Sequence, residues 1–168
     1  MATVIEAIGE NLQAIENAIV ASQVFIDQCA LEGLYPRDVV HWHALRVEDV
    51  EGDQFSLEDF RMPFVVLDVP AMSFELLGTS CYAPQITVRM LISDRSRAEN
   101  HKESFIGFVN FYGALLADIW QGLNTTDERP VFRSYVQQMP PERTMRTRKS
   151  STNDIWRQAG DFVIGADV

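Results

Sequence analysis

The chain has 168 residues, 46% of them apolar, and a formal net charge of −10. This length predicts one domain that can bury a core, and the apolar share excludes a disordered chain. No apolar run approaches the roughly 20 residues of a membrane-spanning helix, and the first residues lack the basic-then-apolar order of a signal peptide. We therefore expect a single domain over residues 1–168, made and kept in a cytoplasm.

The negative charge is concentrated at the start of the chain. Residues 1–60 hold 12 acidic and 2 basic side chains, whereas residues 61–168 hold 12 of each. This balance argues against general nucleic-acid binding, which needs clustered cations. Cys29 and Cys81 allow at most one disulfide, and in a reducing compartment both are expected to be buried thiols.

The first predicted element is a long N-terminal helix. Thr3 and Glu6 have the spacing of a capping box, and Gly33 is a suitable helix end. An apolar stripe with helical spacing follows the capping box: Ile5, Ile8, Leu12, Ile15, Ile19 and Ile26. This stripe fits the domain's own core or an oligomer seam, and we expect a core that is partly shared with a neighbour.

Three strands are predicted before the middle of the chain. Residues 38–47 alternate between two faces, residues 62–69 are rich in β-forming side chains up to Pro70, and residues 72–77 alternate again before Gly78. Short links join residues 62–69 to residues 72–77, and residues 72–77 to a further predicted strand at residues 85–92. An antiparallel meander is therefore the simplest pairing.

The centre of the chain is a strand that leads directly into a helix. Residues 85–92 have an apolar residue at every second position, so these side chains share one face of a strand. Residues 93–96 predict a turn, and the apolar residues of 98–121 have a helical period. Ser96 and Glu99 have capping-box spacing at the start of this helix. Gly107 and Gly113 lie inside it, and we expect each to let a neighbouring element approach closely.

The last third predicts a strand over residues 131–138, a loop over residues 142–153 and a strand in the final 15 residues, with a turn or bulge at Gly160. The loop lacks periodicity, and we expect it to be mobile in the isolated subunit. The predicted fold class is α+β: a twisted, mainly antiparallel sheet packed by the long N-terminal helix and the long central helix.

Catalytic chemistry finds little support in the sequence. His41 and His43 share a face of a predicted strand, but a third metal ligand, such as His101, is not supplied by spacing, so a half-exposed strand face is the expected reading. Neither cysteine lies in a nucleophile motif, and the glycines form no phosphate-binding loop. We predict no enzyme activity, no metal and no cofactor.

The predicted loop carries a basic cluster, the candidate subunit interface, which consists of Arg143, Arg146, Arg148 and Lys149. Only Glu142 opposes it nearby. Its complement could be the acidic N-terminal third of a neighbouring copy, in a head-to-tail contact that closes into a ring. An exposed loop without a partner and a contact with DNA remain open as alternatives.

The order of these elements resembles that of the tail-terminator and neck (head–tail joining) proteins of tailed bacteriophages. The resemblance lies in residues 63–67, in the strand-to-helix passage of residues 86–120, and in the final strand of residues 156–164 after a loose loop. Residues 38–60 have no counterpart in that pattern.

The resemblance implies a structural virion protein assembled in the host cytoplasm. Such proteins form a hexameric ring that caps the tail tube, ends tail growth and joins the tail to the head connector, with DNA passing through and possible contact with a sheath protein. No membrane is involved. A connector or stopper protein of the neck and a small non-viral binding domain are the alternative readings.

Overall fold

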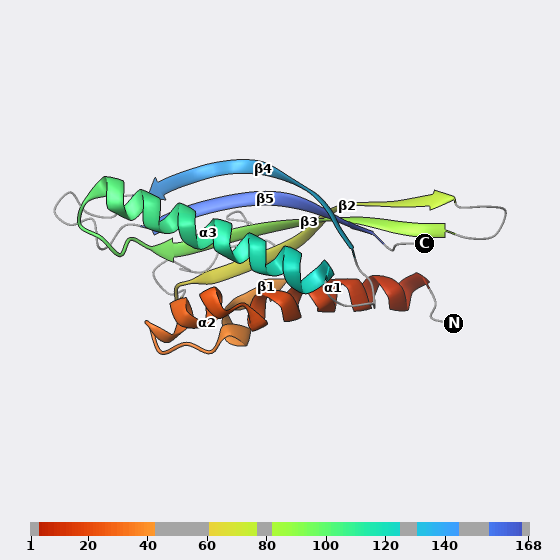
Figure 1. The fold of residues 1–168 in the computed structure, drawn as a ribbon. Helices are drawn as coiled ribbons and strands as arrows, with labels where there is room; N and C mark the ends of the chain where they lie inside the picture. Colours follow the sequence, from red (N-terminus) through yellow and green to blue (C-terminus); the bar gives the residue numbers. More distant parts are fainter. Residues whose placement is uncertain (1–3, 43–60, 77–81, 125–130, 145–154, 166–168) are drawn as a thin grey trace, which may run out of the picture.

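A five-stranded sheet forms one layer of the structure, and helices cover one of its faces (Figure 1). The computed structural model describes residues 4–42, 61–76, 82–124, 131–144 and 155–165. The helices are α1 (Val4–Ala21), α2 (Gln23–Ala30) and α3 (His101–Asn124), with a 3₁₀ turn η1 (Pro36–Val39); the strands are β1 (Val40–Trp42), β2 (Phe64–Leu76), β3 (Tyr82–Arg95), β4 (Val131–Thr144) and β5 (Ile155–Gly165). The predicted α+β class is confirmed.

The strand order is β1-β2-β3-β5-β4, with β3 at the centre. β1 runs parallel to β2, and the other neighbours are antiparallel. Of the predicted meander, the antiparallel pairing of residues 72–77 with residues 85–92 is confirmed. The predicted pairing of residues 62–69 with residues 72–77 is wrong, because both runs belong to the single strand β2.

The core lies between β3 and the helices. The side chains that the alternation assigns to one face of β3 are fully buried, and they share a cluster with Leu115 and Ile119 of α3: Ile86, Val88, Met90 and Ile92. Burying each such side chain contributes about 1.5–3 kcal/mol. α3 is therefore held against the sheet by the period-two pattern of β3.

The N-terminal helix is broken at Ser22, where one continuous helix was predicted. Ser22 has an extended backbone (φ −64°, ψ 123°) and its Oγ accepts from the backbone N–H of Phe25 at 3.4 Å. The same hydroxyl donates to Asp118 Oδ2 of α3 at 2.6 Å. Serine favours such N-cap positions over helix interiors because its side chain competes for backbone groups.

The break changes which residues α2 buries. Ile15 and Ile19 of the predicted stripe are fully buried in α1, but in α2 Phe25 and Cys29 are fully buried while Ile26 is only half-buried. The chain then leaves the helix at Gly33, which has a positive φ of 66° that glycine adopts without strain. The predicted end near Gly33 is confirmed.

Prolines do not end β2 and β4 as predicted. β2 continues past Pro70 with a register shift against β3 between Asp68 and Ala71, and β4 continues past Pro140 and Pro141 with register shifts against β5. At these prolines, neither β2 nor β4 has another described strand on its outer side. Proline is tolerated at such edges and bulges, because its missing N–H group is not needed for a strand pair there. The predicted loop of residues 142–153 is wrong at its start, because residues 142–144 belong to β4.

Three further expectations need correction. Residues 36–39 form η1, so the strand predicted from residue 38 begins only at Val40, and its residues 43–47 lie outside the described part. α3 begins at His101, because Asn100 Oδ1 accepts from the backbone N–H groups of Lys102 and Glu103 at 2.9 and 3.4 Å. Asn100 is therefore the N-cap, whereas Ser96 was predicted.

Gly107, Gly113 and Gly160 do not have the predicted roles. A Cβ at Gly107 or Gly113 would meet nothing within 4 Å, so neither glycine serves a close approach within the subunit. Gly122 allows a close approach of α3 to α1, since a Cβ at Gly122 would lie 3.3 Å from the Cβ of Ala18 in α1. β5 has no bulge at Gly160; it pairs with β3 without a shift.

Gly160 instead makes room for Tyr135 of β4. A Cβ at Gly160 would overlap the phenol ring and hydroxyl of Tyr135, whose Oη lies 2.6 Å from Oη of Tyr112 in α3. This contact joins β4 to the helix layer across β5.

No helix in the described ranges is long and apolar enough to cross a membrane.

We predict that Gly160→Ala lowers the free energy of unfolding by about 1–3 kcal/mol, because the methyl group displaces the Tyr135 ring. Urea denaturation measures this change. In a Tyr135→Ala background the obstacle is gone, and Gly160→Ala should then have almost no effect. An equal loss in both backgrounds would show that the glycine is needed for another reason.

Candidate functional site

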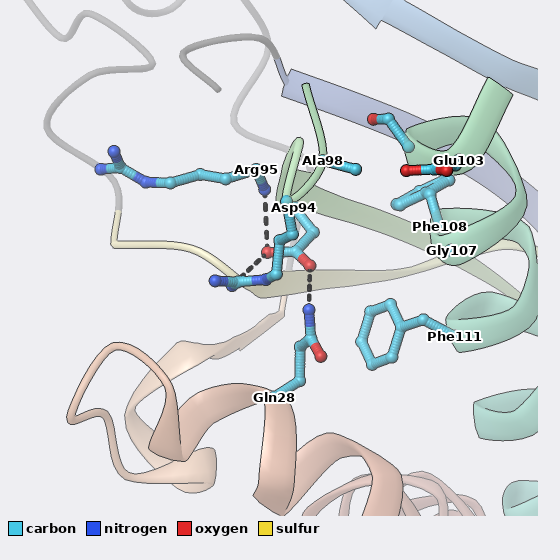
Figure 2. Close-up of a pocket in the computed structure, with 10 residues that line it drawn as sticks. Gln28, Asp94, Arg95, Ala98, Glu103, Gly107, Phe108 and Phe111 are labelled. Atoms are coloured by element: carbon cyan, nitrogen blue, oxygen red, sulfur yellow. Dashed lines mark hydrogen bonds and ion pairs between the residues drawn. The ribbon is translucent and has the colours of Figure 1, made fainter. Parts of the chain in front are cut away.

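A buried carboxylate lies at the end of β3, where the strand approaches α2 and α3 (Figure 2). Asp94 is 2% exposed and is the next residue after Ile92 on the helix-facing side of β3. It accepts hydrogen bonds from Gln28 Nε2 at 2.6 Å, from the backbone N–H of Arg95 at 2.8 Å and from Arg97 Nη2 at 3.0 Å. These bonds tie α2 and the segment before α3 to the central strand.

The charges around Asp94 are largely balanced within the subunit. Burial raises the pKa of the Asp94 carboxyl group, and the nearby Arg97 guanidinium and the hydrogen bonds only partly offset this effect. Arg97 also donates from Nη1 to Glu32 Oε1 at 3.0 Å. The Arg97 guanidinium therefore bridges two carboxylates.

A second buried network fixes the first turns of α3 on the sheet. Trp156 of β5 donates from Nε1 to Ser104 Oγ at 2.7 Å, and Ser104 Oγ is hydrogen-bonded to Ser96 Oγ. The Trp156 ring also stacks on Phe108 with ring centroids 6.0 Å apart. Ser104 and Phe108 thus hold α3 in place from the sheet side.

Between these two networks lies a pocket of about 270 Å³. One wall carries polar groups from Gln28, Asp94 and Arg97, and the other is the α3 face that carries Phe108 and Phe111 (Figure 2). Gly107 lies on the α3 wall, where its missing side chain leaves open space. We call this cavity the α2–α3 pocket.

The thiol of Cys29 lies fully buried behind this region. Burial, followed by the charge of Asp94, raises the pKa of the thiol to about 11, and Arg97 opposes the shift. A thiol in this state is almost entirely protonated at neutral pH and is a poor nucleophile. The buried-thiol prediction is confirmed for Cys29, while Cys81 lies outside the described residues.

The predicted basic cluster is only partly described. Arg143 lies near the end of β4, opposite Trp156 of β5, and its Nη1 donates to His101 Nδ1 at 2.5 Å. It is therefore a strand residue beside the start of α3, where a loop residue was predicted. Arg146, Arg148 and Lys149 lie outside the described residues.

The histidines considered as metal ligands lie apart in the topology. His41 belongs to β1 at one edge of the sheet, His101 starts α3 beside β4 at the other, and His43 lies outside the described part. Within the described residues, no group of three His, Cys, Asp or Glu side chains could hold a metal ion.

The two edges of the sheet form the other feature of functional interest. β1 pairs with β2 only over residues 65–67, so residues 68–76 of β2 have no strand on their outer side among the described residues. β3 pairs with β5 only from Gln85 onward, so residues 82–84 have β2 as their described strand partner. The β2–β3 ribbon therefore extends beyond the rest of the sheet, as Figure 1 shows.

Sequence reasoning missed Asp94 and Gly107 as parts of a pocket. Asp94 was predicted in a turn, although the alternation that buries Ile86 to Ile92 places it on the same face two residues later. A carboxylate at a buried strand position is the signal that could have identified it. Gly107 carries no such signal, because its surroundings depend on how α3 is packed.

No protein-family model matches the chain, and a search of curated proteins finds no significant match.

We predict that the free energy of unfolding falls as pH rises from 9 to 11 because of Cys29. The folded-state pKa of about 11 lies above the ordinary 9.0, so the thiol's contribution is complete below pH 9 and is lost as pH rises through 11. Urea titrations of the wild type and Cys29→Ala measure the difference, since other groups titrate equally in both proteins.

Thiol labelling provides a control for this prediction. In a Cys81→Ser variant at pH 8, a thiol reagent should react with Cys29 only after urea is added. Rapid labelling of the folded variant would contradict the burial of Cys29.

Proposed function

We propose that the chain is a structural subunit that joins copies of itself head to tail into a closed ring. By its resemblance in element order to phage tail-terminator proteins, the ring is a hexamer that caps a tail tube, ends tail growth and joins the tail to the head connector. The observation that carries the proposal is a pair of sheet edges without a strand partner among the described residues: residues 68–76 of β2, beyond β1, on one side, and β4 on the other.

The strand directions support a head-to-tail contact. β2 is antiparallel to β3, and β3 is antiparallel to β5, so β2 and β5 run in the same direction. β4 is antiparallel to β5, and β2 and β4 therefore run in opposite directions. If the next copy adds its β2 beside β4, the antiparallel alternation of the sheet continues without interruption. A contact between two different edges is heterologous, and it closes into a ring when the rotation allows.

The end of the β2–β3 ribbon supports the same contact. An isolated two-stranded ribbon is at best marginally stable in water. Residues 71–76 of β2 contain no proline or glycine and only one charged residue, Glu75, so they lack the usual protection of an exposed edge. Met72 is 46% exposed there. A neighbouring strand would cover this edge.

The outer edge of β4 offers a matching segment at the same end of the sheet. Val131 of β4 aligns with Gly165 of β5, which aligns with Gln85 beside the ribbon. Val136 is 57% exposed. Residues 134–137 pair with β5 without a register shift and precede the prolines of β4. This part of the edge would therefore lie beside the extended ribbon of a neighbour.

We expect the wild-type chain to have the mass of a hexamer, or of a salt-sensitive monomer–hexamer mixture, in light scattering and native mass spectrometry. Met72→Lys and Val136→Lys each place a charge on one of the two edges and should weaken association by about tenfold or more. Leu31→Lys is the matched control, because Leu31 is 64% exposed directly after α2 and belongs to neither of the two edge segments. A wild-type monomer at every concentration would contradict the ring.

The basic cluster gives a second prediction. Reversing Arg146, Arg148 and Lys149 to Glu should weaken assembly most at low salt, where charge attraction between subunits is strongest. Arg143 is kept, because its contact with His101 supports the fold. Arg61→Glu is the control, since Arg61 is exposed outside this cluster. Unchanged assembly of the triple variant, with an unchanged melting temperature, would remove the cluster from the interface.

A further inference from the structure

The α2–α3 pocket is kept open by a glycine that the fold itself does not need. Gly107 lies inside α3, where glycine is less favourable than alanine. A Cβ at this position would meet no atom within 4 Å, so no neighbouring element of the subunit requires the glycine. Gly107 lines the pocket, and any larger side chain there would occupy its space.

The pocket is too small for most cofactors but suits a single long side chain. Its volume of about 270 Å³ lies below the approximately 300–1,000 Å³ of sites for drug-sized ligands. Phe108 and Phe111 supply aromatic surface on the α3 wall. A flexible side chain with an apolar stem and a polar end would cover this surface and place its end beside Glu103 at the start of α3.

The charges around the pocket favour a cation as the polar end. The Arg97 guanidinium is already bound by Asp94 and Glu32, and the Arg95 side chain extends away from the aromatic wall (Figure 2). Glu103 lines the pocket and forms no ion pair with any residue in the described ranges. The carboxylate of Glu103 and the aromatic ring of Phe111 both attract a positive charge.

An anion has fewer free donors at this site. The start of α3 would normally offer backbone N–H groups to an anion. Here the N–H groups of Lys102 and Glu103 donate to Asn100 Oδ1, and that of Ser104 donates to the Asn100 carbonyl oxygen. The helix start is therefore already satisfied within the subunit.

We propose that the α2–α3 pocket receives an arginine or lysine side chain from residues 143–149 of a second copy of the chain. This inference rests on the proposed function for the source of the side chain. Charge complementarity supports that source, because this stretch holds four cations and no acidic residue in a chain whose net charge is −10. This insertion would add a second, charge-dependent contact between subunits to the contact between their sheet edges.

The test measures binding of a fluorescent peptide with the sequence of residues 142–153 to the full-length chain, below the concentration at which the chain self-associates. We expect Gly107→Leu to weaken binding by about tenfold or more, since the leucine fills the pocket. Gly113→Leu is the matched control: it lies in the same helix with equally open surroundings but does not line the pocket. It should bind as the wild type does.

A second variant keeps the test valid if Gly107→Leu alters the fold. Glu103→Gln changes an exposed side chain and should weaken binding several-fold at low salt and less at high salt. A peptide with its cations replaced by glutamine should not bind. Equal binding of that peptide, or tighter binding of an acidic peptide from residues 47–54, would overturn the proposal.

The outcome separates this inference from the ring. If the wild-type chain forms hexamers but Gly107→Leu neither weakens peptide binding nor alters the hexamer, the pocket proposal fails and the ring stands. If the basic peptide binds in a Gly107-dependent way but the chain never associates, the pocket accepts a basic side chain and the ring proposal fails, together with the second copy as its source.

Discussion

The structure depends on covering one face of β3. Because β3 lies between β2 and β5, its alternating apolar side chains point either toward the helices or away from them. The helix-facing side chains are fully exposed to water unless α3 and α1 lie over them, and the burial of four such residues is worth several kcal/mol. The positions of α3 and of the helix pair before it follow from this requirement.

Two polar contacts then set where α1 ends and how α2 lies against β3 and α3. Ser22 ends α1, caps α2 and is bound to Asp118 of α3, while Asp94 holds α2 through Gln28. Both groups lie in or beside the core, where an unpaired hydrogen-bonding group is costly. The α2–α3 pocket exists because these contacts hold α2 near the first turns of α3 without filling the space over Gly107.

The edges of the sheet, unlike its buried centre, carry backbone groups without a described strand partner. Its centre is paired on both sides, but the outer part of β2 and the outer side of β4 have no strand partner among the described residues. Backbone groups on such edges are satisfied by water or by another chain. This is why the proposed function is an assembly of subunits, and why the pocket is interpreted as part of a contact between copies.

The sequence by itself determined the α+β class, the buried face of β3 and the existence of a long central helix. These features depend on local period, which is readable from Ile86 to Ile92 and from Phe108 to Ile119. The tertiary structure decided that β2 and β4 continue past their prolines, since that depends on which side of each strand is unpaired. It also decided that Gly160 makes room for Tyr135, and that Asp94 and Gly107 line one pocket. These residues are distant in sequence, and their relation arises only when α2, α3 and β3 pack together.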